Sequence, residues 1–278
     1  MQDLSLRDAA PVGVFDSGLG GLSVVSAIRR RLPHEALIYI ADSRYAPYGE
    51  KTDTFIRARS LALAEWLVRQ GAKALVVACN TATTHAIADL RERLAVPIIG
   101  VEPGIKPAVQ ASASKVVGVL ATAATLRSDK LQQLLAAHGQ ACRFICQPGH
   151  GLVEQIEQGA ADGAVVDTLL AQYLTPMVDA GADTLVLGST HYAWLMPAIR
   201  RRFGDRMRLI ETAAAIAQRV AQQLEQHGLA APPRAGEAPM ALCSTALSED
   251  LRTPLARLAQ DMLPPEGRVV GIEVGGAD

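Results

Sequence analysis

Short apolar runs alternate along this chain with longer amphipathic stretches. The runs have the length of buried strands, whereas apolar residues in the stretches recur every three or four positions, as on one face of a helix. The apolar runs are residues 12–15, 37–40, 75–78, 98–101, 116–120, 185–187 and 209–210, and the amphipathic stretches are residues 54–70, 84–94, 165–180 and 212–227. Strands that alternate with helices predict an α/β fold whose parallel sheets are covered by helices on both faces.

A breaker-rich segment, residues 230–239, follows this pattern and contains three prolines. Clustered prolines favour a connection on the protein surface. Beyond it, the pattern predicts a strand at 240–243, a helix at 248–261 and a last strand at 268–274. We therefore expect a small C-terminal appendage to the main fold.

Two segments of the chain repeat each other in register. Residues 71–81 read GAKALVVACNT and residues 181–191 read GADTLVLGSTH, so glycine, alanine, leucine and valine recur at matching places. The match sets Cys79 opposite Ser189. A repeat of this length indicates that one structural unit occurs twice.

Two further matches support the repeat, because residues 12–14 resemble 117–119 and residues 101–102 resemble 210–211. The three offsets, 110, 105 and 109 residues, agree with one another. We therefore predict two similar parallel-sheet α/β domains related by pseudo-twofold symmetry. We place the first domain at 11–103 plus 212–278 and the second at 104–211.

The charge balance changes the expected partner. Lys and Arg together number 27 and Asp and Glu 28, so no basic surface indicates nucleic acid or an anionic membrane, and a small molecule is expected as the partner.

The first ten residues carry charges and no apolar signal core, and no apolar run is long enough to span a bilayer. We expect a cytoplasmic protein. Its four cysteines form no CxxC pair, which favours reduced thiols and argues against a zinc site.

Polar residues follow several of the predicted strands. They include Asp16 and Ser17, Cys79 to Thr81, Thr122 to Thr125, and Ser189 to His191. In open parallel sheets, ligands bind outside the carboxyl ends of the strands. If the two domains face each other, these loops converge and present one reactive group to each face of a bound molecule.

Cys79 lies between a predicted strand and a helix expected to begin at Thr83 or Thr84. The partial positive charge of a helix N-terminus stabilises a thiolate, which makes the thiol a base or a nucleophile. The alternative is a buried, inert cysteine. The neighbouring Asn80 and Thr81 have no evident turn role and favour a functional site.

The glycine-rich turn at residues 16–23 lacks both GxGxxG and GxxxxGK[ST] spacing, which weakens a nucleotide-binding interpretation. Its backbone N–H groups suit the binding of a carboxylate ligand. The alternative is a tight turn in which Asp16 caps the next helix.

Residues 47–49 offer backbone donors and a phenol for ligand binding, and the alternative is a simple turn. His191 titrates near neutrality and suits acid–base work, although a lone histidine is often structural. Glu154 lies on a predicted helix, where a solvated face is the alternative.

Four motifs resemble, in order and spacing, those of the glutamate racemases of the aspartate/glutamate racemase superfamily. They are FDSGLGGLSV at 15–24, PYGEK at 47–51, ACNTAT at 78–83 and GSTHY at 188–192. The resemblance runs from about residue 12 to 227. It implies two half-domains and two cysteine bases that act without pyridoxal phosphate, another cofactor or a metal. It also implies glutamate as substrate, D-glutamate supply for peptidoglycan and cell-wall synthesis, and a homodimer as one expected assembly.

The resemblance also assigns roles to residues. It makes Cys79 one base, facing D-glutamate, with Asp16 and His191 as assisting groups and Glu154 as a third. The substrate-binding set that it implies is Ser17, Pro47, Tyr48, Gly49, Asn80, Thr81, Thr83, Thr125 and Thr190.

One departure concerns the second base. The family has Cys-Thr-His-Tyr-Pro where this chain has Ser189 and then Thr-His-Tyr-Ala. An engineered replacement of Cys by Ser accounts for Ser189 alone. Natural sequence divergence accounts for Ser189 together with Ala193 and Trp194. An alkanol ionises far above neutral pH, so Ser189 is expected to fail as a base and to impair racemisation. The alternatives are a single-thiol decarboxylase or isomerase of a small dicarboxylate, and an inactive D-glutamate-binding relative.

Overall fold

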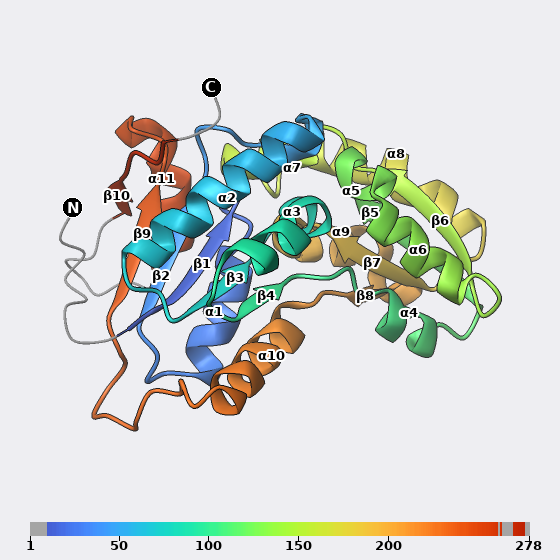
Figure 1. Ribbon diagram of the computed structural model, residues 1–278. Helices are drawn as coiled ribbons and strands as arrows, with labels where there is room; N and C mark the ends of the chain where they lie inside the picture. The colour runs from blue at the N-terminus through green and yellow to red at the C-terminus, as the bar shows by residue number, and fades with distance from the viewer. Residues whose placement is uncertain (1–9, 261, 263–268, 276–278) are drawn as a thin grey trace.

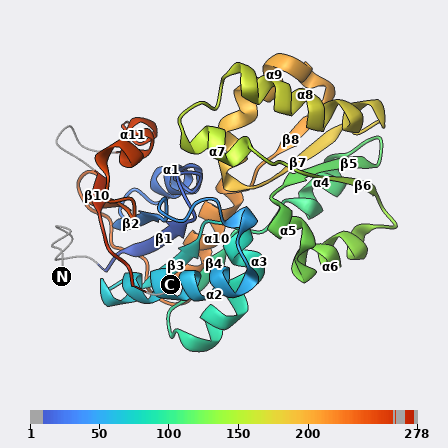
Figure 2. The same cartoon turned by 90° about the horizontal axis from the view of Figure 1, so that it is seen from above.

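A computed structural model describes residues 10–260, 262 and 269–275. Three expectations extend beyond these residues: the charged segment 1–9, the end of the C-terminal helix at 261, and the start of the last strand at 268. Two parallel sheets form the centre of the described chain (Figure 1). They lie side by side when the molecule is viewed from above (Figure 2).

In the described part of the chain, the first sheet has the strand order β10-β9-β2-β1-β3-β4 and the second β6-β5-β7-β8. Every pair of neighbouring strands is parallel. The first sheet contains β1 (Val12–Asp16), β2 (Leu37–Ala41), β3 (Ala74–Val77), β4 (Ile98–Gly100), β9 (Met240–Ser244) and β10 (Val269–Gly271), and the second contains β5 (Val116–Ala121), β6 (Arg143–Pro148), β7 (Thr184–Gly188) and β8 (Arg208–Ile210). The predicted fold class is confirmed.

Helices cover both faces of the first sheet because its strands are apolar on both sides. Val14 of β1 packs in the cluster that contains α1 (Leu22–Arg31) and α10 (Ala213–Gln226). Phe15, the next residue, packs in the cluster that contains α2 (Asp53–Arg69) and α3 (Asn80–Arg93). Helix α10 lies against α1 and β4, so the chain returns to the first sheet after β8.

The second sheet is covered in the same way. One face packs against α8 (Ala164–Asp179) and α9 (Met196–Phe203), and the other against α4 (Ile105–Ala111) and α6 (Asp129–His138). The remaining elements are η1 (Tyr48–Glu50), α5 (Ala123–Arg127), α7 (Leu152–Glu157), η2 (Thr190–Leu195), η3 (Gly204–Arg206) and α11 (Glu249–Leu258). The sequence pattern did not mark β6, because it is an exposed edge strand whose apolar residues are only partly buried.

The duplication is visible in the backbone as well as in the strand order. Strands β2-β1-β3-β4 and β6-β5-β7-β8 occupy equivalent places. Gly71 and Gly181, which open the repeated segments, have φ of 86° and 88°, a region that side chains disfavour. Cys79 and Ser189, eight residues further on in each copy, both have extended backbones that precede a helical turn. The same chain geometry therefore delivers both residues to the ends of β3 and β7.

No helix in the ranges that the structure describes is both long and apolar enough to cross a membrane.

Candidate active site

The carboxyl ends of β1 and β3 bring Asp16 and Cys79 together, because these two strands are neighbours in the sheet. Asp16 is fully buried and Cys79 is 4% exposed. The Ser17 N–H donates to Asp16 Oδ1 at 2.7 Å, and the Cys79 thiol lies 3.5 Å from Ser17 Oγ. The Asp16 carboxylate lies close enough to Cys79 that its charge acts on the thiol. A thiol, a hydroxyl and a carboxylate thus share one buried site.

Cys79 is itself the N-cap of α3, because the helix begins at Asn80 rather than at Thr83 or Thr84. The Ala82 N–H donates to Cys79 Sγ at 3.4 Å. The expectation that the helix N-terminus lowers the pKa of this thiol was wrong for the unliganded site. Burial, followed by the charge of Asp16, raises the pKa of Cys79 to about 12. Loss of solvation outweighs the hydrogen bonds with Ala82 and Ser17, so the thiol is protonated near neutral pH.

The second half contributes Ser189, Thr190 and His191, which follow β7 and lie in or next to η2. The Thr190 hydroxyl donates to Asp16 Oδ2 at 3.0 Å. Asp16 therefore contacts residues from both halves. Ser189 is 7% exposed, and its hydroxyl has no hydrogen-bond partner among the described residues.

His191 forms the charged group of the second half. Its Nε2 lies 2.6 Å from Glu157 Oε1, which also accepts the Leu19 N–H at 2.8 Å. Burial lowers the pKa of His191, but the hydrogen bond and charge of Glu157, with the charges of Asp16 and Glu154, outweigh burial and raise it. The imidazolium is therefore favoured beside Ser189.

The carboxylate that contacts His191 is Glu157, a residue that the sequence analysis did not mark. Glu154 lies one turn earlier on α7 and lines a narrow cavity of about 20 Å³ with Gly49 and Thr122. Both glutamates lie on the same helix, three positions apart, and both are partly buried. The sequence pattern does not distinguish the two; only the approach of α7 to the glycine-rich turn selects Glu157.

Three threonine hydroxyls meet where the two halves face each other. Thr81 Oγ1 lies 2.9 Å from Thr122 Oγ1 and 3.1 Å from Thr125 Oγ1. Thr122 and Thr125 are 2.9 Å apart and belong to the start of α5. Such a cluster supplies donors for a carboxylate group.

Asn80 has a buried amide nitrogen, Nδ2, without a hydrogen-bond partner in the described chain. A buried donor of this kind is costly unless a ligand satisfies it. Asn80 therefore indicates a ligand position next to Cys79. Thr83 differs, because its hydroxyl donates to the Val77 carbonyl and accepts the Val101 N–H. Its hydrogen bonds thus connect β3 with the segment after β4.

The segment at residues 47–49 lies across from α5. Pro47 and Gly49 line the same cavity as Glu154, and a Cβ on Gly49 would lie 2.8 Å from the Thr122 side chain. The Tyr48 phenol turns away and donates to Asp42 Oδ2 at 2.5 Å. The phenol is therefore hydrogen-bonded to Asp42, and the backbone of residues 47–49 faces the second half.

The site is closed to solvent in this structure. Asp16, Cys79, Asn80 and Thr190 are each at most 8% exposed. The cavity beside Gly49 has the volume of about one water molecule. An amino acid therefore enters only when the halves separate.

Within the described residues, no group of three or more His, Cys, Asp or Glu side chains is arranged to hold a metal ion. All four cysteines are free.

Comparison with known proteins agrees with this arrangement. The family model described as Asp/Glu/Hydantoin racemase matches residues 20–220. The chain belongs to this family. The resemblance noted in the sequence is confirmed.

Its relatives are glutamate racemases. The one from Cupriavidus pinatubonensis is 60% identical over 226 residues, which cover 81% of this chain and 83% of that protein. The structure of the Escherichia coli glutamate racemase, in complex with L-glutamate and the activator UDP-MurNAc-ala, is similar with a TM-score of 0.83, 32% identity and coverage of 96% of this chain and 99% of that one. The Francisella tularensis glutamate racemase in complex with D-glutamate gives a TM-score of 0.82, 27% identity and coverage of 96% and 98%.

Proposed function

We propose that this chain is an amino-acid racemase, an isomerase that interconverts L- and D-glutamate by proton transfer at the α-carbon and so supplies D-glutamate for peptidoglycan. The observation that carries the proposal is the equivalent placement of Cys79 and Ser189 on two facing halves, with Asp16 in contact with both sides. Groups on opposite faces of a substrate solve the stereochemical problem, because one removes the α-proton and the other delivers a proton.

Cys79 is the proposed base. Burial keeps its thiol protonated, and Asp16 is the adjacent carboxylate that accepts its proton. The α-ammonium group of glutamate, placed beside these residues, adds a positive charge that favours the thiolate. The thiolate then removes the α-proton of D-glutamate.

Substrate binding uses groups from both halves. We assign the α-carboxylate to Asn80 and the hydroxyl of Thr81, since the free amide of Asn80 requires an acceptor. Ser17, Thr190 and Thr125, with the backbone at 47–49, complete the proposed pocket. These donors stabilise the negative charge that develops on the carboxylate as the proton leaves.

The second face is chemically weaker. Ser189 has no hydrogen-bond partner in the described residues, and its hydroxyl is a much weaker acid than a thiol. The His191–Glu157 pair lies next to it and supplies the positive charge and the proton reserve of this half. We expect net racemisation to be impaired, whereas exchange at the Cys79 face persists.

The closed site requires domain motion. We propose that the moving units are residues 11–103 with 212–278, and residues 104–211. The two connections between the halves, β4 to α4 and β8 to α10, are the natural hinges (Figure 2). Closure excludes water from the carbanion-like intermediate.

The proposal includes three further expectations. The reaction needs neither pyridoxal phosphate nor a metal, so activity is expected to survive dialysis against a chelator. The enzyme acts in the cytoplasm, where its free thiols remain reduced. A homodimer is the expected assembly, which light scattering measures directly.

The test is proton exchange in deuterium oxide, followed by NMR with each enantiomer of glutamate. We expect deuterium to enter D-glutamate faster than L-glutamate appears. Binding of D-glutamate with no exchange identifies an inactive relative. Turnover of malonates or maleate without glutamate exchange identifies the single-thiol decarboxylase or isomerase, which the similarity to glutamate racemases does not favour.

A further inference from the structure

Asp42 is a buried carboxylate that the proposed reaction does not use. It follows β2, is fully buried, and its N–H donates to the Asp16 carbonyl at 2.9 Å. It thus lies one strand over from Asp16, the last residue of β1, and one position beyond Ala41, the register partner of Asp16. A buried charge at this edge of the sheet requires a reason.

The Asp42 carboxylate is surrounded by donors from three parts of the described chain. Tyr48 donates to Oδ2 at 2.5 Å, and Arg59 donates to both oxygens at 2.8 and 2.7 Å. The Thr245 hydroxyl donates to Oδ1 at 2.8 Å. Because each donor approaches from a fixed element, the carboxylate is held in one orientation. The orientation of the Tyr48 phenol then follows from that of Asp42.

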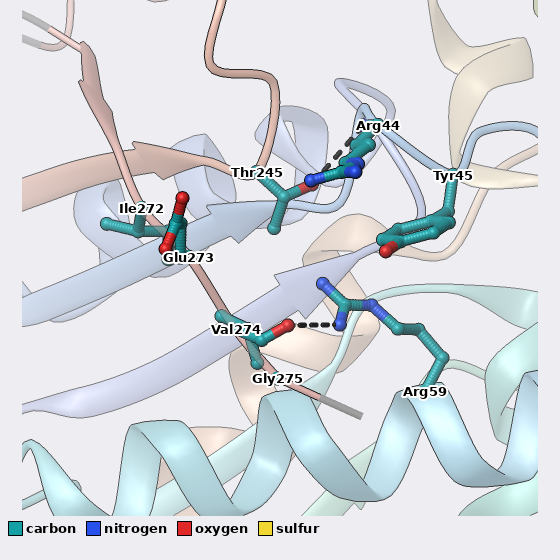
Figure 3. A pocket seen from close by; sticks show the side chains of 8 residues that line it. All are labelled: Arg44, Tyr45, Arg59, Thr245, Ile272, Glu273, Val274 and Gly275. Atoms are coloured by element: carbon teal, nitrogen blue, oxygen red, sulfur yellow. Dashed lines mark hydrogen bonds between the residues drawn. The ribbon is translucent and has the colours of Figure 1, made fainter. Parts of the chain in front are cut away.

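Two of these contacts lead to the C-terminal segment, residues 240–275. Thr245 follows β9, and Arg59 Nη1 donates to the Val274 carbonyl at 2.6 Å (Figure 3). The Arg59 guanidinium also lies 4.5 Å from the centre of the Tyr45 ring. This segment lies outside residues 20–220, the part that the family model matches. It nevertheless reaches the loop that carries residues 47–49.

Tyr48 connects this cluster with the substrate pocket. Its phenol is fixed by Asp42, and the adjacent Gly49 packs against Thr122 of the second half. The Asp42 contact and the approach to Thr122 therefore act on the same short segment, residues 48–49. Buried ion pairs with complete hydrogen bonding add little stability but fix geometry well.

We propose that Asp42, Arg59 and Thr245 are positioning residues for substrate binding, and that the C-terminal segment thereby completes the active site through Tyr48. The inference rests on the proposed function for its kinetic consequence, because the backbone at 47–49 is part of the proposed glutamate pocket. The structural consequence, the orientation of Tyr48, is independent of the reaction.

The first test is Thr245→Val, which removes one donor to Asp42 while keeping the side-chain size. We expect KM for glutamate to rise about fivefold to tenfold, with kcat changed less than about twofold. Thr253→Val is the matched control, since this threonine of α11 bonds only within its helix and its replacement leaves KM unchanged. In a Tyr48→Phe background, Thr245→Val is expected to add no further rise in KM. A purely structural role predicts the same added effect in both backgrounds, which would overturn the inference.

The second test measures the environment of the Tyr48 ring directly. Protein labelled with 3-fluorotyrosine gives fluorine NMR signals from its five tyrosines, and Tyr48→Phe assigns the one from Tyr48. We expect Thr245→Val to shift this signal and Thr253→Val to leave it in place. An unchanged signal, or a shifted signal with unchanged KM, overturns the inference. If the unmodified protein does not act on glutamate, the proposed function fails, and the fluorine signal alone decides the orientation of Tyr48.

Discussion

The two halves of this molecule share a scaffold but differ in the chemistry that they deliver to the cleft. The first half places a thiol beside a buried carboxylate, Cys79 with Asp16. The second half places an alcohol beside a favoured imidazolium, Ser189 with His191. Strand order and the paired glycines are the same in both. The comparison shows that the scaffold does not depend on which reactive atom it carries.

The difference assigns distinct tasks to the halves. The thiol of the first half has a carboxylate to receive its proton, so it can cycle between thiol and thiolate. Among the described residues, no carboxylate bonds to the alcohol of the second half, and the surroundings of the nearby His191 raise its pKa and favour the imidazolium. We therefore expect the first half to break the C–H bond, and the second half to limit inversion.

The largest effect is expected from Cys79→Ala. Removal of the Cys79 thiol takes the proposed base from the face of D-glutamate, so deuterium exchange into either enantiomer should fall about a thousandfold or more. The NMR exchange assay measures this loss. Ser189→Ala is the matched control at the equivalent position and should retain exchange into D-glutamate. Persistent exchange in Cys79→Ala would show that another group is the base.

A large gain is expected from Ser189→Cys. A thiol at the second face supplies the missing acid and base, so racemisation in both directions should rise about a hundredfold. Circular dichroism of the product mixture follows both directions. If the unmodified chain racemises both enantiomers as fast as this variant, the two-thiol mechanism does not apply to it.

An intermediate effect is expected from Glu157→Gln. Loss of the carboxylate removes the charge that raises the pKa of His191, so the imidazolium is lost at lower pH. Conversion to L-glutamate should fall about tenfold near neutral pH and should decline earlier as pH rises, while exchange into D-glutamate stays within about twofold. Glu154→Gln, one turn away, serves as control. A larger effect of Glu154→Gln would show that Glu154, the third assisting group that the resemblance implies, contributes more than Glu157.

The smallest effect concerns a position where the repeat carries opposite charges, Lys73 in the first half and Asp183 in the second. Burial raises the pKa of Asp183, but hydrogen bonds from Ser112, Ser114, Thr184 and Ala113 outweigh it and lower the pKa to about 2. Because this pKa lies below the ordinary value of 3.8, the stabilisation is present above that pH and is lost as pH falls towards 2.

Asp183→Asn should remove this acid dependence. Asp183 is partly exposed, so solvent screens its charge and we expect a change in the free energy of unfolding of about 1 kcal/mol or less at neutral pH. Urea denaturation at pH 7 and pH 3 measures it. An equal loss of stability at both values would assign the effect to packing rather than to charge.

Much of the fold follows from local pattern. Apolar runs marked nearly all central strands because those strands are buried on both faces, and the repeat of residues 71–81 at 181–191 predicted equivalent placement of Cys79 and Ser189. The sequence pattern did not predict the edge strand β6, because some of its residues are exposed and its apolar and polar residues are mixed. The start of α3 was placed too late, because a residue such as Asn80 favours caps and turns over the helix itself.

The sequence by itself determined the two parallel sheets and the family, because these depend on local spacing and on side chains at strand ends. Only the tertiary structure decided which glutamate contacts His191, that the Tyr48 phenol binds Asp42, and that burial raises the pKa of Cys79. Each of these depends on groups distant in the chain. Desolvation and hydrogen bonding are set by the surroundings of a group in space, and spacing along one strand or helix does not specify those surroundings.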